Sequence, residues 1–248
     1  MNNIITSFII TFLAGLSTII GIIPIFFNNK YKEKIICFSL AFSSSIMITI
    51  SILSLIPEAM NYLNSLNIIN ILITLIFINI GIIISTYIDK KLDKRINNNS
   101  LLKVGIVGLI AIILHNIPEG ITTFITSSNN LKIGLTLSIA IALHNIPEGI
   151  SIAIPIYYST NSYKKALLYT SISGFSEFFG AVFAFIFLKN IINNYLMAII
   201  LSITAGIMIQ ISFFELLPTS LKYKSKLTYT GLLLGFIIMY ICIIIFRI

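Results

Sequence analysis

Charged residues are scarce in this chain of 248 residues: lysine, arginine, aspartate and glutamate make up 10% of it, whereas 57% is hydrophobic. A soluble domain of this length has too little interior to bury so much apolar surface. No hydrophilic stretch is long enough to fold as a separate soluble domain. The composition therefore excludes an ordinary soluble protein and favours a membrane protein that crosses the bilayer several times.

Cysteine and histidine are also rare. The chain holds two cysteines, Cys37 and Cys242, and two histidines, His115 and His144. Both cysteines lie in apolar runs and are far apart in the sequence. This placement excludes a disulfide framework and a cysteine-based zinc cluster.

Apolar runs of about 20 residues, enough to cross a bilayer core of about 30 Å as a helix, occur eight times. The alternation typical of membrane β-barrels is absent. No basic residue precedes Lys30, so the first run is expected to stay as a membrane helix rather than to be cleaved as a signal peptide. We predict an all-α membrane protein with a single transmembrane transporter domain over residues 1–248. The predicted spans are about 3–27, 35–59, 67–88, 103–126, 131–157, 166–188, 194–219 and 227–246.

The net charge of +8 would suggest nucleic-acid binding in a soluble protein. Here we interpret it as a topology signal, and we expect no nucleic-acid partner. Of the 16 basic residues, 13 fall in the loops that follow odd-numbered spans, and only Lys132, Lys189 and Arg247 fall on the opposite side. Because cytoplasmic loops are enriched in lysine and arginine, we expect a multi-pass protein of the cell membrane with both termini outside.

Four of the eight acidic residues lie inside predicted spans, and Glu58 lies at the outer end of the second span. An ionisable group at the centre of a membrane helix costs about 2.5–3.5 kcal/mol on insertion scales. No lysine or arginine is expected at a similar depth. The four residues are therefore expected to be protonated, to line a wet path, or to hold cations. They are Glu119, Glu148, Glu177 and Glu215.

The heptad LHNIPEG occurs twice, at 114–120 and 143–149, and the polar turn at 127–130 lies midway between the two copies. The fourth and fifth spans should therefore form a tight antiparallel hairpin that brings His115 and His144 to one level near the middle of the bilayer. In each copy, histidine and glutamate are four residues apart and share a helix face. Imidazole, carboxylate and amide oxygen at one depth suit Zn²⁺, Fe²⁺, Mn²⁺ or Co²⁺.

Proline and glycine in each heptad add to this interpretation. Pro118 and Pro147 lack the N–H of a regular helix and free a carbonyl one turn earlier, which membrane proteins tolerate where a helix lines a cavity. Gly120 and Gly149 leave room for close approach of a neighbouring helix. Two carboxylates in one pocket repel each other unless a dication or a proton is present, so we expect metal binding to compete with protons.

A second repeat relates residues 46–57, IMITISILSLIP, to residues 207–218, IMIQISFFELLP, with a constant offset of 161. The two spans run in opposite directions under the expected topology, which is typical of an inverted repeat. We predict three spans, a central helical hairpin and three inverted spans. Met47 and Met208 lie at the centres of the two repeated spans, whereas Glu215 lies near a cytoplasmic end and is a candidate way station toward the interior.

The chain is similar to the ZIP (Zrt/Irt-like) family of divalent metal transporters, and most similar to its broad-specificity bacterial branch, which carries HNxPEG on both central helices. The resemblance rests on the two HNIPEG motifs, on SGFSEFFGA in the sixth span and on SFFELLP in the seventh. It implies import of metal toward the cytoplasm, with an elevator-like motion, through a site for two ions. The histidines and glutamates of the heptads would ligate one ion with Met47 nearby, and Asn116, Asn145 and Glu177 would complete the second position. The predicted metal-binding residues are Met47, His115, Asn116, Glu119, His144, Asn145, Glu148, Glu177 and Glu215.

Two features depart from the family pattern. The loop after the third span, DKKLDKRINNNS, lacks the histidines that relatives often carry there, and a neutral residue stands at Asn145 where some relatives have aspartate.

Two other functions compete with a carrier. A membrane-embedded metallohydrolase would use a metal to activate water, but such proteases typically carry HExxH, and this chain shows no separate general base. We therefore expect no enzyme activity and no prosthetic group. A passive metal-selective pore would use the same residues and would differ from a carrier in the saturation of uptake. The expected partners are divalent metal ions and the lipid bilayer. The sequence leaves open a homodimer and does not rank zinc, iron and manganese.

Overall fold

A computed structural model describes residues 2–27, 29–63, 67–93, 100–188 and 193–246. Within these ranges the chain is helical and contains no strand. Four of the basic residues used for the topology prediction, Lys94, Arg95, Lys189 and Arg247, lie outside them. The α-helices are α1 (Asn2–Ile20), α2 (Lys32–Ile50), α3 (Ile56–Tyr62), α4 (Ile68–Asp93), α5 (Ser100–Asn129), α6 (Leu131–Thr160), α7 (Tyr163–Phe183), α8 (Asn194–Ile211), α9 (Leu217–Leu221) and α10 (Lys226–Phe246). Short 3₁₀ turns occupy Ile23–Phe26 and Asn29–Tyr31, and π-helical turns occupy Ser51–Leu55, Ala184–Leu188 and Ser212–Leu216.

Eight helical stretches of the described chain are long and apolar enough to cross a membrane, which confirms the predicted all-α class. The largest difference in bounds is at the end of the third span, which runs to Leu92 instead of residue 88. Polar residues begin three of the helices, because their side chains accept hydrogen bonds from backbone N–H groups of the first turn. These residues are Asn130, Ser162 and Asn193, at the starts of α6, α7 and α8.

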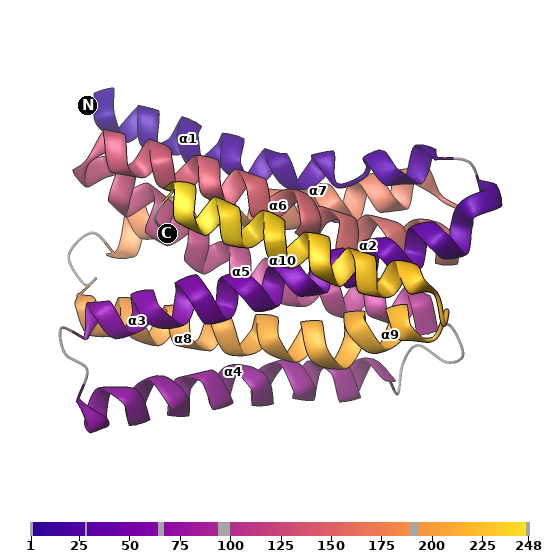
Figure 1. Cartoon of the computed structure of the whole chain (residues 1–248). Helices are drawn as coiled ribbons and strands as arrows, with labels where there is room; N and C mark the ends of the chain where they lie inside the picture. The colour runs from indigo at the N-terminus through magenta and orange to yellow at the C-terminus, as the bar shows by residue number, and fades with distance from the viewer. Residues whose placement is uncertain (1, 28, 64–66, 94–99, 189–192, 247–248) are drawn as a thin grey trace.

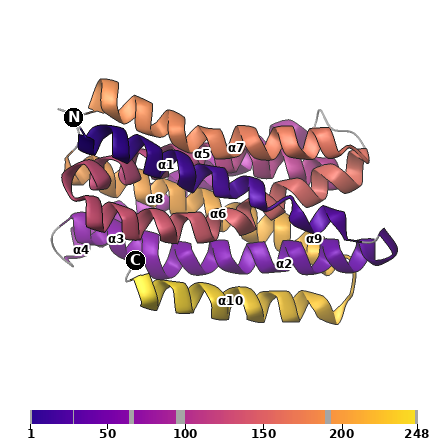
Figure 2. The same cartoon turned by 90° about the horizontal axis from the view of Figure 1, so that it is seen from above.

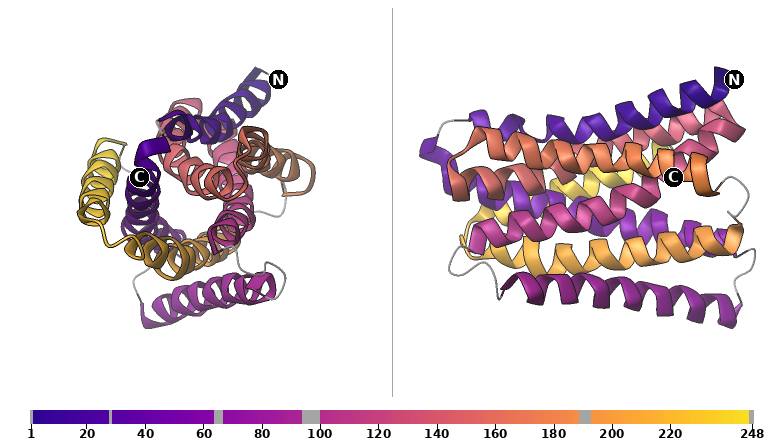
Figure 3. Two further views of the ribbon diagram at one scale, coloured as in Figure 1. Left: turned by 90° about the vertical axis from the view of Figure 1, so that its right-hand side faces the viewer. Right: turned by 180° about the vertical axis from the view of Figure 1, so that it is seen from behind.

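The helices form a single bundle, with α1 and α4 along opposite edges of the view and α10 in front (Figure 1). Helices α1, α5, α6 and α7 pack against one another, α10 packs along α2, and α4 packs along α8. The end-on view places α4 and α10 on the outside, and the view from above shows α10 along the edge beside α2 (Figures 2 and 3). Large apolar side chains such as Ile83 on α4 and Leu233 on α10 are exposed. Exposed apolar faces on peripheral helices are expected where lipid covers them.

The inverted repeat appears in the local structure as well as in the sequence. The π-helical turns Ser51–Leu55 and Ser212–Leu216 lie 161 residues apart, at matching places in the two repeated spans. In each turn, the N–H of the residue before the proline reaches back five residues, from Ile56 to Ser51 and from Leu217 to Ser212. The proline that follows each turn lacks an N–H of its own, which makes this wider turn favourable. Figure 1 shows α2 leading to α3 at one end of the bundle and α8 leading to α9 at the other, so the two spans run in opposite directions.

Glycines in the heptads bring helices into backbone contact. A Cβ atom at Gly120 of α5 would overlap the backbone carbonyl of Glu177 on α7, and a Cβ at Gly149 of α6 would overlap the carbonyl of Thr18 on α1. The expectation that these glycines leave room for a neighbouring helix is confirmed. This close packing fixes the depth of α1 and α7 relative to the central hairpin.

Candidate metal centre

The two heptads meet at one level because α5 and α6 are joined by a tight turn at Asn130. The Asn130 side chain accepts a hydrogen bond from the N–H of Ile133 and so begins α6 directly after α5 ends. His115 and His144 lie at similar distances on either side of this turn, and their ring centroids are 6.4 Å apart. The predicted helical hairpin is confirmed. Both helices run through Pro118 and Pro147 without a break.

The closest contacts between histidine and glutamate cross from one helix to the other. His115 Nε2 lies 2.9 Å from Glu148 Oε1, and His144 Nε2 lies 3.0 Å from Glu119 Oε1. Within α5, His115 Nε2 also lies 3.4 Å from Glu119 Oε1. The heptad spacing predicts pairs within each helix, and the structure adds the shorter pairs between helices.

The four side chains form a compact and buried donor set. Their exposed fractions are 1% for His115, 4% for Glu119, 2% for His144 and 0% for Glu148. Ligand atoms of His115, His144 and Glu148 lie within 4.8 Å of one another. In a tetrahedral zinc site with metal–ligand distances of about 2.0–2.1 Å, neighbouring donors are about 3.3 Å apart. The contacts across the hairpin are close to that separation, so this donor set fits a divalent ion.

Asn116 and Asn145 each follow a heptad histidine by one position, about 100° further round its helix, and Asn145 contacts Glu177 of α7. All three side chains are fully buried. Asn145 Nδ2 donates to Glu177 Oε2 at 2.8 Å and to the carbonyl of Ala14 at 3.1 Å. Asn116 Nδ2 donates to the carbonyl of Ser173 at 3.0 Å. The amide nitrogens are thus fixed by α1 and α7, which leaves the amide oxygens free to accept.

Oxygen and nitrogen atoms without hydrogen-bond partners gather in these two residue groups. Buried polar groups in folded proteins are nearly always paired, so such a concentration needs an explanation. The atoms without a hydrogen bond include Asn116 Oδ1, Glu119 Oε2, Asn145 Oδ1, Glu148 Oε2 and Glu177 Oε1. A set of unsatisfied oxygens around two imidazoles is chemically suited to cations.

The surroundings of the hairpin follow the inverted repeat, with one exception. Asn145 donates to Ala14 on α1, and Asn116 donates in the same way to Ser173 on α7. Ala14 and Ser173 therefore correspond, with an offset of 159 between α1 and α7. By the same offset, Glu177 corresponds to Thr18, whose buried hydroxyl has no hydrogen-bond partner. The second group therefore has a carboxylate on the α7 side and only a hydroxyl on the α1 side.

Met47 and Glu215 are predicted metal-binding residues that belong to neither of the two groups described above. Met47 is 1% exposed and belongs to an apolar core cluster with Met208 and Ile112, so a place beside the ion stays a prediction. Glu215 Oε1 lies 3.5 Å from Lys103 Nζ. Lys103 is about 12 residues, or about 18 Å, along α5 from His115.

The expectation that none of the four glutamates has a basic residue at its depth is wrong for Glu215. Lys103 stands in the first turn of α5 and also contacts Asp89 of α4, at 2.7 Å between Nζ and Oδ1. The sequence assigned Lys103 and Asp89 to a loop. Both belong to the ends of long helices instead, and the flexible lysine stem reaches into the bundle.

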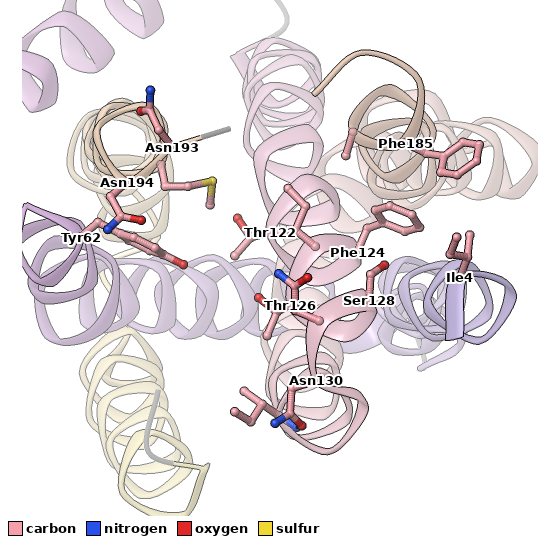
Figure 4. A pocket seen from close by; sticks show the side chains of 15 residues that line it. Ile4, Tyr62, Thr122, Phe124, Thr126, Ser128, Asn130, Phe185, Asn193 and Asn194 are labelled. Atoms are coloured by element: carbon pink, nitrogen blue, oxygen red, sulfur yellow. The ribbon is translucent and has the colours of Figure 1, made fainter. Parts of the chain in front are cut away.

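Cavities lie at the end of the bundle where α3 ends and α6 begins. One, of about 500 Å³, is bordered by Tyr62 and Asn194 on one side and by Thr122 and Thr126 of α5 on the other (Figure 4). A second, which we call the end cavity, has a volume of about 900 Å³ and is lined by Glu58, Asn61, Tyr62 and Lys132 among others. The sequence placed Glu58 at this end but did not connect it with the metal centre.

A third cavity, of about 30 Å³, lies between the end cavity and the candidate metal centre, and we call it the narrow cavity. It shares Ser54, Glu58 and Leu137 with the end cavity and reaches Glu119 and His144. A signal for this path was present in the sequence, because Ser54 and Glu58 are four residues apart and share a helix face.

Comparisons with known proteins place these features in context. The family described as ZIP zinc transporters matches residues 90–243. The protein named zinc transporter ZupT of Clostridium perfringens is 37% identical, over 99% of this chain and 98% of its own length. The proteins of the same name from Streptococcus mutans and Campylobacter jejuni are 36% and 35% identical, over 98% and 96% of this chain and 98% and 95% of their own lengths. These relatives are named as transporters rather than enzymes.

Proposed function

Because the chain belongs to the ZIP family of zinc transporters, we propose that it takes up divalent transition-metal ions across the cytoplasmic membrane, zinc at least. The ion would bind between the two central helices, at His115, Glu119, His144 and Glu148. The observation that carries this proposal is the pair of crossed contacts, in which each histidine of the hairpin meets the glutamate of the other helix at 2.9–3.0 Å.

The donor set also favours further substrates and a second bound ion. Two imidazoles and two carboxylates suit Fe²⁺, Mn²⁺ and Co²⁺ as well as Zn²⁺. The free oxygens of Asn116, Asn145 and Glu177 support a second position beside the first. We propose Met47 as a neighbour of the first ion, supported by its central place in the repeated span.

The remaining elements of the proposal concern the path and the topology. We propose that Glu215 receives the ion on the cytoplasmic side, where the ion would replace Lys103 as the cation beside the Glu215 carboxylate. The contact between Lys103 and Glu215 supports this role. We further propose that residues 1–248 act as a single transmembrane transporter domain with both termini outside. The excess of lysine and arginine in the loops after odd-numbered spans supports this orientation.

Uptake of radioactive zinc by proteoliposomes tests the function. We expect saturable uptake by the wild type, and at least about a 100-fold loss of zinc affinity in His144→Ala and in Glu119→Ala. Glu33→Gln, which removes a carboxylate from the first turn of α2, is the matched control and should transport as the wild type does. Normal uptake by the two centre variants, with intact insertion into the membrane, would contradict the proposal.

Acidification should weaken binding, because protonated imidazole and protonated carboxylate cannot ligate a metal. Binding releases protons, so the zinc affinity should be highest near neutral pH and should fall as the pH is lowered. A zinc titration of the purified protein at about pH 7.5 and about pH 5.5 measures this effect. Equal affinity at both values would contradict ligation by these side chains.

A further inference from the structure

Glu58 lines both the end cavity and the narrow cavity, so it stands where a wide space becomes a constricted one. It belongs to α3, directly after Pro57, and lies on one helix face with Ser54 and Asn61. All three side chains line the end cavity. A hydroxyl, a carboxylate and an amide oxygen on one face make this wall rich in oxygen acceptors for a cation.

The size of the two cavities indicates what each can hold. The end cavity, at about 900 Å³, accommodates an ion with its full hydration shell. The narrow cavity, at about 30 Å³, has room for about two water molecules. An ion must therefore lose most of its water between the two, and protein oxygens at the boundary would replace some of that water.

The walls of the narrow cavity make this loss of water costly without a charged partner. Five of its lining residues are apolar: Ile50, Leu55, Leu137, Ile141 and Leu201. Moving a dication from water into such surroundings requires compensating ligands. Carboxylates stand at both ends of the passage, Glu58 toward the end cavity and Glu119 at the metal centre. Two carboxylates at the ends of one passage repel each other when both are charged, so a cation between them stabilises both.

Lys132 opposes the attraction of cations to Glu58. Lys132 lines the end cavity together with Glu58, and it is exposed. A lysine in the same cavity repels an arriving cation and reduces the local excess of negative charge. The balance of the two residues should therefore set how strongly the end cavity concentrates cations.

We propose that Glu58 is a capture site for hydrated divalent cations, which holds the ion in the end cavity before the ion loses water and passes to Glu119 and His144. This inference rests on the proposed function, in which the metal centre of the hairpin is the transport site. Glu58 should then affect the KM of transport and not its kcat, because capture in the end cavity precedes binding at the metal centre.

Uptake kinetics of Zn²⁺ in proteoliposomes test the capture site. Glu58→Gln should raise KM at least about fivefold with kcat within about twofold of the wild type, and the effect should shrink at high ionic strength. Glu58→Asp should recover most of the loss. Lys132→Gln should lower KM. Glu33→Gln and Lys164→Gln make the same changes of charge at the opposite end of the bundle and should leave KM unchanged. An unchanged KM in Glu58→Gln, or an equal rise in Glu33→Gln, would overturn the proposal.

Equilibrium binding separates this proposal from the proposed function. Calorimetric titration with Zn²⁺ would use the full chain in lipid nanodiscs, with the metal centre disabled by His144→Ala and Glu119→Ala. In that background, adding Glu58→Gln should remove one weak zinc equivalent, whereas adding Glu33→Gln should not. Persistence of that equivalent after Glu58→Gln, or its absence beforehand, would overturn the capture site. If the wild type failed to transport zinc, the proposed function would fail and this titration would still decide the role of Glu58.

Discussion

Each histidine of the hairpin has its nearest carboxylate on the other helix. Because His115 meets Glu148 and His144 meets Glu119 at 2.9–3.0 Å, neither helix alone assembles the four donors. The spacing within a heptad reveals which side chains share a helix face, but it holds no information on which partner across the hairpin is nearer. The residue types that meet in the hairpin were therefore predictable from the sequence, and the crossed pairing was not.

The difference between Glu177 on α7 and Thr18 on α1 gives a residue-scale prediction. Glu177→Gln should reduce the number of zinc ions bound per chain from two to one, because it removes the only carboxylate of the second group. Thr18→Val, at the corresponding position on α1, is the matched control and should leave the number unchanged. Zinc bound to the purified protein, counted by elemental analysis after dialysis, measures both. Two ions per chain in Glu177→Gln would show that the second position does not need this carboxylate.

Glu215 shows why counting charges by predicted depth failed at one position. Lys103 was predicted at the edge of a loop, whereas α5 begins at Ser100 and the lysine side chain is mostly buried. Element boundaries are the least reliable part of a prediction from sequence. A long side chain at a boundary can lie in either environment, so the pairing of Lys103 with an acid three spans further along the chain was not predictable.

Helix contacts through glycine yield a prediction at the scale of the elements. Gly120→Ala and Gly149→Ala should each destabilise the folded protein by about 1–3 kcal/mol, because the new methyl group overlaps a backbone carbonyl of the neighbouring helix. Gly108→Ala is the control, since its Cβ would have only the carbonyl of Ser151 nearby, at 3.9 Å. That change should be neutral or should stabilise by about 0.5–1 kcal/mol. Thermal unfolding in detergent measures all three.

Most of the fold followed from the apolar runs and the two repeats. The eight predicted runs match eight helical stretches long enough to cross a membrane in the described part of the chain, and a turn midway between identical heptads gave the hairpin. The offset of 161 relates the two segments that hold the π-helical turns, but the turns themselves and their wider hydrogen bonding were not predicted. The way α4 covers α8 and α10 covers α2 could not be predicted, because lipid-facing and protein-facing residues of these spans are equally apolar.

Orientation in the membrane is a property of the whole molecule. The first and last described helices, α1 and α10, have their free ends at the same end of the bundle (Figure 1). In a Cys242→Ser background that keeps the fully buried Cys37, Asn129→Cys should react with a membrane-impermeant thiol reagent added to intact cells. Lys164→Cys should react only after the cells are permeabilised. The reverse pattern would place both termini in the cytoplasm.

The near equivalence of the α1 and α7 surroundings has a thermodynamic consequence. Ala14 and Ser173 hold the two asparagines in the same way, and Gly15 and Gly174 each face the other's carbonyl. Except at Glu177 and Thr18, the two halves of this cradle offer the hairpin similar contacts. A carrier without an energy source moves zinc down whichever concentration gradient is imposed, and this similarity should let liposomes loaded with zinc release it through the same route at a comparable rate.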